Sequence, residues 1–401
     1  MQEERISIIG VPCSTDPSVP LEPLTGGPLL KFTIQQEDLQ NALGLVANVV
    51  PGKTTMPILT CVLLEAEDDR LTVSATNLDM SVTTGTGNVN VKSGGRLAVP
   101  ATKFIPFVRS LSAGEVQITE KGGRVNIVSG KASLSESSMN AEEFPALPAL
   151  DGDKGLEVET GDLTRMIKST AYAVSRDETR PALMGILWEL KPTALTMVAT
   201  DAHRLARITR KADWGIKDIT TLITDTQGLL QFVRLAEGCE KSEVFFNDNQ
   251  LSFRMGETTL HTRLLEGPFP DYTAVIPKSN NMTMTIDREA FISAVRRVSI
   301  TADRVTSQIR LGIENGRLEM SATGTDGSRA EDELPVSYDG EAMEIGFNYN
   351  YLLDVLKNIV ADSVELSMKD PQSAALVSPA EAGADDDDLL CLLMPLRLTS
   401  D

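Results

Sequence analysis

One sequence pattern occurs three times along this chain, and the repetition constrains the fold more than any other feature. Residues 71–76 (LTVSAT) return as 195–200 (LTMVAT) and again as 318–323 (LEMSAT), at offsets of 124 and 123 residues. Three positions that each precede a helix-like stretch recur at a spacing of 124: Val99, Ile223 and Phe347. A period of this size matches a small domain and not a solenoid repeat. The sequence therefore predicts three tandem copies of one domain.

Each copy contains a helix-like stretch, a strand rich in Thr, Val and Ala, and a second helix-like stretch, which indicates an α+β fold. We place the three copies at residues 31–150, 151–278 and 279–398. Residues 1–30 are rich in Pro and Gly without sustained periodicity, so we expect a flexible extension or a mis-assigned start. Residues 399–401 form a short tail.

Composition excludes several classes of protein. No run of 18 or more apolar residues occurs, which argues against a membrane span. The four cysteines (Cys13, Cys61, Cys239 and Cys391) are scattered, which is typical of reduced thiols in a cytoplasmic protein and not of a disulfide framework or a zinc site. Residues 380–388 end in four aspartates but lack the glycine and spaced ligands of a calcium loop, so we expect a solvated loop and no metal.

The predicted helices carry cations at matching positions. Apolar residues at i, i+3, i+4 and i+7 define a buried stripe, as at Phe104, Phe107, Val108 and Leu111. Five of the six helices place Lys or Arg five residues after the first apolar anchor, about 140° around the helix and away from that stripe. With further cations on the same helices, the candidate polyanion-binding residues are Arg109, Arg165, Lys168, Arg176, Arg234, Arg296, Arg304 and Lys357.

The charge distribution supports a polyanion on one surface only. The six helical segments (36–53, 101–112, 161–176, 225–237, 287–304 and 348–360) hold 12 Lys and Arg against nine Asp and Glu. Because the whole chain has a net charge of −20, the remainder carries −23. A basic surface on an acidic body is typical of a protein that binds nucleic acid on one face. The alternative is that these cations merely solvate helix surfaces.

Base recognition and catalysis both lack a sequence signal. Aromatic residues make up only 4% of the chain, so phosphate contacts would be weak, salt-dependent and independent of base sequence. His203 and Asp201 could form an acid–base pair, but no nucleophile accompanies them, and no phosphate-binding glycine loop is present. We therefore expect a non-catalytic protein without a cofactor.

Four segments, in order and at matching spacing, resemble the bacterial β sliding clamp family, the β subunits of DNA polymerase III. They are residues 199–206 (ATDAHRLA), 267–272 (GPFPDY), 343–348 (MEIGFN) and 393–398 (LMPLRL). The resemblance implies three similar domains of the DNA clamp fold, each with two helices facing inward and antiparallel sheets outside. It also implies that two chains close head to tail into a ring.

The resemblance implies a processivity factor that encircles double-stranded DNA and has no catalytic activity. The implied partners are the catalytic subunit of the replicative polymerase, an ATP-dependent clamp loader, and repair or other polymerases that carry short linear motifs. A cytoplasmic homodimer follows from the same resemblance. It places Leu134 and Ile300 at the dimer interface.

The family also binds peptides of the Gln-Leu-x-Leu-Phe kind in an apolar cleft. Carried over by matching motifs, the cleft residues are Leu183, Thr200, His203, Arg204, Leu205, Pro270, Val275, Leu392, Met394, Pro395, Leu396 and Arg397. The chain departs from the family pattern at Ala202, where many members have glycine, and at Ala182, where an aromatic residue is common.

The sequence is also compatible with three other interpretations. The chain could be an acidic three-domain scaffold that binds proteins and no DNA. It could be an enzyme with an interdomain cleft that uses Asp201 and His203. Within the clamp interpretation, it could be a specialised duplicate of a housekeeping clamp.

Overall fold

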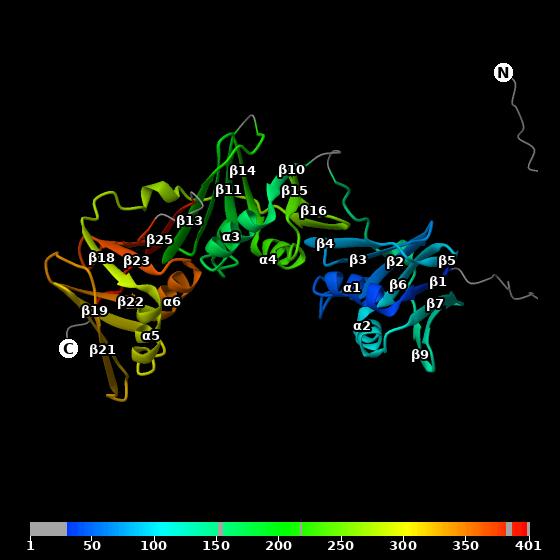
Figure 1. Cartoon of the computed structure of the whole chain (residues 1–401), viewed down its shortest axis with the longest axis horizontal. Helices are drawn as coiled ribbons and strands as arrows, with labels where there is room; N and C mark the ends of the chain where they lie inside the picture. Colours follow the sequence, from blue (N-terminus) through cyan, green and yellow to red (C-terminus); the bar gives the residue numbers. More distant parts are fainter. Residues whose placement is uncertain (1–29, 151–154, 217–218, 382–386, 399–401) are drawn as a thin grey trace, which may run out of the picture.

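The computed structural model describes residues 30–150, 155–216, 219–381 and 387–398. The expected extension, apart from Leu30, and the expected tail at 399–401 lie outside the described residues. Three similar units follow one another along an arc, with the helices on its concave side and the sheets on its convex side (Figure 1). The α+β architecture expected from the three repeats is confirmed.

All six expected helices are present in the described part of the chain, and each ends a few residues earlier than the sequence pattern indicated. They are α1 (Gln36–Val46), α2 (Ala101–Ser110), α3 (Thr160–Ala171), α4 (Thr226–Leu235), α5 (Arg288–Val298) and α6 (Tyr349–Asn358). Asp225, Asp287 and Asn348 cap the last three by accepting hydrogen bonds from backbone N–H groups of the first turn. These caps fix where the helices start.

The strands form four antiparallel sheets. The strands of the first unit are β1 (Leu30–Gln35), β2 (Cys61–Glu67), β3 (Arg70–Thr76), β4 (Met80–Thr86), β5 (Asn90–Ser93), β6 (Gly95–Pro100), β7 (Glu115–Lys121), β8 (Arg124–Ser129) and β9 (Ala132–Ser137). Those of the second are β10 (Leu156–Glu159), β11 (Gly185–Lys191), β12 (Ala194–Thr200), β13 (Arg204–Lys211), β14 (Thr220–Asp225), β15 (Lys241–Phe246), β16 (Gln250–Met255) and β17 (Thr258–Arg263). Those of the third are β18 (Met282–Asp287), β19 (Gln308–Glu314), β20 (Arg317–Thr323), β21 (Arg329–Pro335), β22 (Met343–Asn348), β23 (Ser363–Met368), β24 (Ala375–Pro379) and β25 (Asp387–Leu393).

The helices pack on the sheets through the stripes that the sequence predicted. Phe104, Leu229 and Leu352 are fully buried. About one turn further along, Val108, Phe232 and Leu356 are also fully buried, whereas Phe107 and Val233 are half-buried. The rings of Phe232 on α4 and Phe253 on β16 lie 4.3 Å apart, which joins helix and sheet in the second unit. The repeated strands β3, β12 and β20 occupy the same place in each unit.

Two of the sheets cross from one unit to the next. β4 of the first unit pairs with β17 of the second, and β13 of the second pairs with β25 of the third, giving two eight-stranded sheets. The remaining five-stranded sheet ends at β5 and β9, and the four-stranded sheet ends at β21 and β22. Backbone hydrogen bonds therefore join the three units into continuous sheets. Such junctions are more rigid than side-chain contacts between separate units would be.

An ion-pair network crosses the junction between the second and third units. Asp387 accepts from Arg165 Nε at 2.8 Å and from Arg210 at 3.0 Å, while Asp162 pairs with the same two arginines at 3.0 and 2.6 Å. The next residue, Asp388, pairs with Arg207 at 2.6 Å but is largely exposed. The expected solvated loop at 380–388 is thus wrong for its last two aspartates, which begin β25 because basic residues of β13 face them. Residues 382–386 lie outside the described residues.

Two absences hold for the part of the chain that the structure describes. No helix there combines the length and the apolar character that crossing a membrane requires. Nor do three or more His, Cys, Asp or Glu side chains gather there in a way that could hold a metal ion.

The network predicts unequal effects for two neighbouring substitutions. Asp387→Asn leaves two arginines with one carboxylate in a poorly solvated place, so we expect a loss of about 2–4 kcal/mol in the free energy of unfolding. Asp388→Asn removes an exposed pair and should cost less than about 1 kcal/mol. Urea denaturation of both variants measures the difference. Equal stability losses would show that the network does not brace the junction.

Candidate functional site

An apolar cluster lies on the outer face of the sheet shared by the second and third units. Side chains alternate along each strand, so Leu187, Val198, Leu205 and Leu392 face outward while their neighbours face the helices. Part of the cluster is covered by the segment after β17, whose Phe269 and Tyr272 pack against it. Leu205 lies directly opposite Leu392 across the junction, so residues from two units build one surface.

The turn between β12 and β13 forms one rim of this surface. The Thr200 hydroxyl donates to the Arg204 carbonyl at 2.7 Å, and Asp201 Oδ1 accepts from the backbone N–H groups of His203 and Arg204. Ala202 has a φ of 76°, in the left-handed region where glycine is unstrained. This geometry explains physically why glycine suits the position at which the chain departs from the family pattern.

Arg204 is held inside the site and does not extend into solvent. Its guanidinium pairs with Asp201 at 3.0 Å and Asp354 at 2.7 Å, and it lies 5.5 and 4.5 Å from the ring centres of Tyr172 and Tyr351. The Arg204 side chain is only 10% exposed, and its contacts hold the turn between β12 and β13 in place. The sequence did not indicate the roles of Tyr172, which follows α3, or of Tyr351 and Asp354 on α6, because all three lie far from the turn in the sequence.

His203 and Met394 are exposed next to the turn between β12 and β13. The His203 ring stacks on Tyr351 with 6.1 Å between ring centres, and its backbone carbonyl accepts from the Met394 N–H at 2.9 Å. Met394 is 43% exposed. The structure therefore places an exposed imidazole and a flexible thioether next to each other beside the apolar cluster, an arrangement suited to an apolar peptide side chain.

The other candidate residues are distributed around this centre. Leu183, on the short helix η3 (Pro181–Met184), is buried, whereas Pro270 and Val275 are exposed on the segment after β17. Pro395 is half-buried and follows Met394 directly. Leu396 and Arg397 bond to the third unit, through the Gly346 carbonyl at 2.8 Å and Gln308 at 3.2 Å respectively. These last two contacts lead the chain away from His203.

The cationic candidates lie on the helical layer or just beyond it. Seven of the eight are exposed and form no ion pair within the described residues: Arg109, Lys168, Arg176, Arg234, Arg296, Arg304 and Lys357. Arg165 differs because Asp162 and Asp387 neutralise its charge. The helices that carry most of these residues occupy the concave side of the arc (Figure 1).

The two residues expected at a dimer interface lie at opposite ends of the arc. Leu134 is half-buried on β9, the edge strand of the first unit. Ile300 is 82% exposed just after α5, in a segment tied to β20 by a hydrogen bond from Thr301 to the Ala322 carbonyl. The same segment presents Val305, which is 92% exposed and was not among the expected residues.

Comparisons with known proteins agree with this architecture. Family descriptions of the DNA polymerase III beta subunit match residues 30–148 (N-terminal domain), 157–271 (central domain) and 273–397 (C-terminal domain). The beta sliding clamp of Caulobacter vibrioides is 34% identical over 378 residues, which cover 92% of this chain and all of the relative. The Pseudomonas putida clamp is 32% identical over 376 residues, with the same coverage of each chain.

Solved structures give the same result. A C. crescentus β sliding clamp has a TM-score of 0.87 at 34% identity and covers 93% of this chain and 100% of its own. A Pseudomonas aeruginosa clamp bound to griselimycin has a TM-score of 0.86 at 31% identity, again with 93% and 100% covered. The chain belongs to the bacterial β sliding clamp family, the non-catalytic β subunits of DNA polymerase III.

Proposed function

We propose that two copies of this chain close into a ring, that its helical layer contacts DNA, and that the site around His203 and Met394 tethers partner proteins. The chain is a DNA sliding clamp by family, and DNA and polymerase are the partners that this implies. The observation that best supports the proposal is the arc itself, with exposed cations on concave helices and an acidic remainder.

The exposed cations suit a surface that slides. A closed ring retains duplex DNA by topology, so strong contacts are unnecessary and would slow movement. Exposed Lys and Arg side chains on helices make rapidly exchanging, salt-dependent phosphate contacts without reading bases. Negative charge on the rest of the chain disfavours DNA binding outside the ring.

Reversing two free cations tests the DNA-contacting surface. We expect Lys168→Glu with Arg176→Glu to shorten retention on nicked circular DNA severalfold at moderate salt, because phosphate contacts are replaced by repulsion. Lys92→Glu with Lys211→Glu makes the same charge change on exposed sheet residues and should leave retention unchanged. Gel filtration of loaded DNA measures retention, and light scattering checks the dimer. Equal retention of the two double variants on DNA would contradict the proposal that the helical layer contacts DNA.

The internal junctions suggest how two chains close. At the first junction, Leu260 of β17 lies opposite Val82 of β4. The equivalent pair at the second junction is Cys391 of β25 and Ala206 of β13, so the register is the same. Two end strands correspond to these junction strands: β9 corresponds to β17, and β21 corresponds to β4 and β13. If the third junction between chains repeats this register, Leu134 of one protomer lies opposite Ala330 of its partner.

The same register places opposite charges together. Glu257 lies across from Gly85 at the first junction, where the Gly85 N–H donates to the Glu257 carbonyl at 3.2 Å. The corresponding residues of the free edges are Lys131 and Glu333, both exposed. Closure would also cover the exposed Ile300 and Val305 in a head-to-tail dimer with two identical interfaces.

A charge exchange tests this register. Lys131→Glu or Glu333→Lys alone should weaken the dimer about tenfold, since each interface gains a like-charge pair and the ring has two interfaces. The double variant, Lys131→Glu with Glu333→Lys, should recover most of the wild-type affinity. Sedimentation over a dilution series measures dissociation. Failure of the double variant to recover would exclude this register.

The cleft around His203 and Met394 fits an extended peptide with apolar anchors. Leu205 and Leu392 form its floor, and the rim supplies the imidazole of His203 and the thioether of Met394. Such a site gives partners a common, modest affinity, which allows polymerase, clamp loader and repair factors to exchange on one ring. We place this exchange in the cytoplasm, where DNA replication in bacteria takes place.

A single substitution tests the cleft. In fluorescence-polarisation titrations with a Gln-Leu-x-Leu-Phe peptide, Met394→Glu should abolish saturable binding, because a carboxylate would meet the apolar anchors. Met56→Glu alters a methionine of similar exposure in the first unit and should bind as the wild type does. Binding that survives Met394→Glu, or a folded wild-type protein that does not bind, would remove the cleft from the proposed function.

A further inference from the structure

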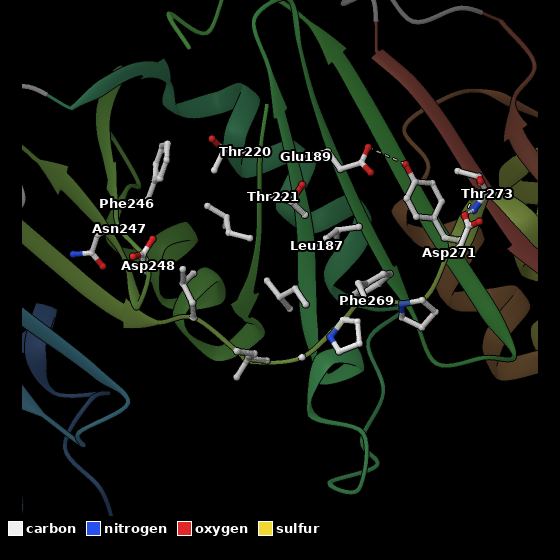
Figure 2. A pocket seen from close by; sticks show the side chains of 18 residues that line it. Leu187, Glu189, Thr220, Thr221, Phe246, Asn247, Asp248, Phe269, Asp271 and Thr273 are labelled. Carbon is white, nitrogen blue, oxygen red and sulfur yellow. Dashed lines mark hydrogen bonds between the residues drawn. The ribbon is translucent and has the colours of Figure 1, made fainter. Parts of the chain in front are cut away.

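A second hollow lies beside the cleft, along β14. It has a volume of about 760 Å³ and lies between β14, the turn after β15 and the segment that follows β17 (Figure 2). Pro270 belongs both to its wall and to the predicted peptide cleft. The hollow and the cleft are therefore separated by a single segment of chain, with Phe269 packed in the apolar cluster between them.

One wall of the hollow is an open sheet edge. β14 pairs with the strand β11 on one side and is the end strand of its sheet, and on its other side a single bridge joins Thr224 to Leu264. The Ile223 carbonyl points away from β11, because it accepts from the Leu265 N–H at 2.8 Å. Backbone groups alternate in direction along an antiparallel strand, so Thr221, two residues earlier, directs its N–H and carbonyl to the same free edge. Thr221 is exposed and lines the hollow.

The charges around this edge have one sign. Among the described residues, its lining includes Glu189, Asp248 and Asp271 and contains no Lys or Arg. Tyr272 donates to Glu189 at 3.0 Å, and burial together with this carboxylate raises the pKa of Tyr272 to about 12, so the hydroxyl stays protonated. Glu189 Oε2 also lies 3.6 Å from Lys191 Nζ, whereas Asp248 is exposed and forms no ion pair among the described residues.

Apolar side chains complete the walls. Leu187 and Phe269 line the hollow between Asp248 and Asp271, and Phe246 lies at the end near Asp248 (Figure 2). An extended strand presents alternate side chains to opposite sides, so apolar residues could meet these walls while basic residues meet the carboxylates. An acidic lining repels the phosphates of nucleic acid. A polypeptide with basic side chains therefore fits the hollow better than nucleic acid does.

We propose that an extended, basic segment of a partner protein adds as a strand to β14, next to a motif bound in the cleft. This inference rests on the proposed function of the cleft, since the segment and the motif belong to one partner chain. Main-chain hydrogen bonds at Thr221 supply affinity, and the carboxylates select basic over acidic flanks. Two linked contacts bind more tightly than either alone. A partner with a basic segment beside its motif therefore binds this chain more tightly than a partner that carries the motif only.

The test compares peptides on the full chain. A Gln-Leu-Ser-Leu-Phe peptide is extended, at either end in turn, with Lys-Val-Arg-Val-Lys through a Gly-Ser linker, and a matched peptide carries Glu-Val-Glu-Val-Glu. We expect one basic extension to tighten binding about tenfold and the acidic one to give no gain. Thr221→Pro removes an N–H that the β14–β11 ladder does not use, so it should cancel the gain without unfolding the edge strand.

Two charge variants and one further peptide complete the design. Asp248→Lys should reduce the gain severalfold, while Glu115→Lys on β7 makes the same charge change far from the hollow and should leave it intact. The basic extension alone, with the motif replaced by alanines, is titrated to high concentration, so that the hollow is tested even if the motif fails to bind. Binding lost in Thr221→Pro supports the proposal. Three results would overturn the proposal: no gain in affinity from either basic extension, an equal gain from the acidic extension, or undiminished binding of the basic extension by Thr221→Pro. If only the motif peptide fails to bind, the result counts against the cleft and not against the hollow.

Discussion

Edge-to-edge strand pairing between successive units is the constraint on which the rest of the structure depends. Each unit offers one free strand at each end, and β4–β17 and β13–β25 join these edges in the same register. An unpaired edge is a template for another chain, and a row of three units joined in this way leaves one unused junction strand at each end, β9 and β21. The curvature of the arc and the concave position of the helices follow from repeating one junction.

The same backbone geometry serves different purposes at the two internal junctions. Arg263 N–H donates to the Asp79 carbonyl at 3.0 Å in the first, as Met394 N–H donates to His203 in the second. The turns agree in detail, because Leu78 has a φ of 79° where Ala202 has 76°. The side chains differ: the first junction pairs Asp79 with Arg263, and Ser81 lies opposite the buried His261. An apolar cleft therefore forms only at the second of these two junctions, where leucines replace polar residues.

The sequence predicted the features that depend on local periodicity and missed those that depend on pairing between distant segments. Repeat number, helix positions and exposed cations follow from the 3.6-residue stripe and from composition. The role of Asp387 could not be predicted, because its partners Arg165 and Arg210 lie more than 170 residues away along the chain. For the same reason Arg165 looked free and Arg204 looked available, although carboxylates neutralise both. The twelve cleft residues came from the resemblance and not from any pattern in the residues themselves.

Helix α6 connects the two surfaces proposed to bind DNA and partner proteins. Its Lys357 is exposed on the helical layer, while Tyr351 and Asp354, within two turns of it, hold His203 and Arg204. A helix keeps its side chains at fixed relative positions, so the rim of the cleft is positioned by an element of the layer proposed to contact DNA and not by a flexible loop. The cleft therefore needs little ordering when a peptide arrives, which lowers the entropy cost of binding. A small site can then have useful affinity even though it must release one partner for the next.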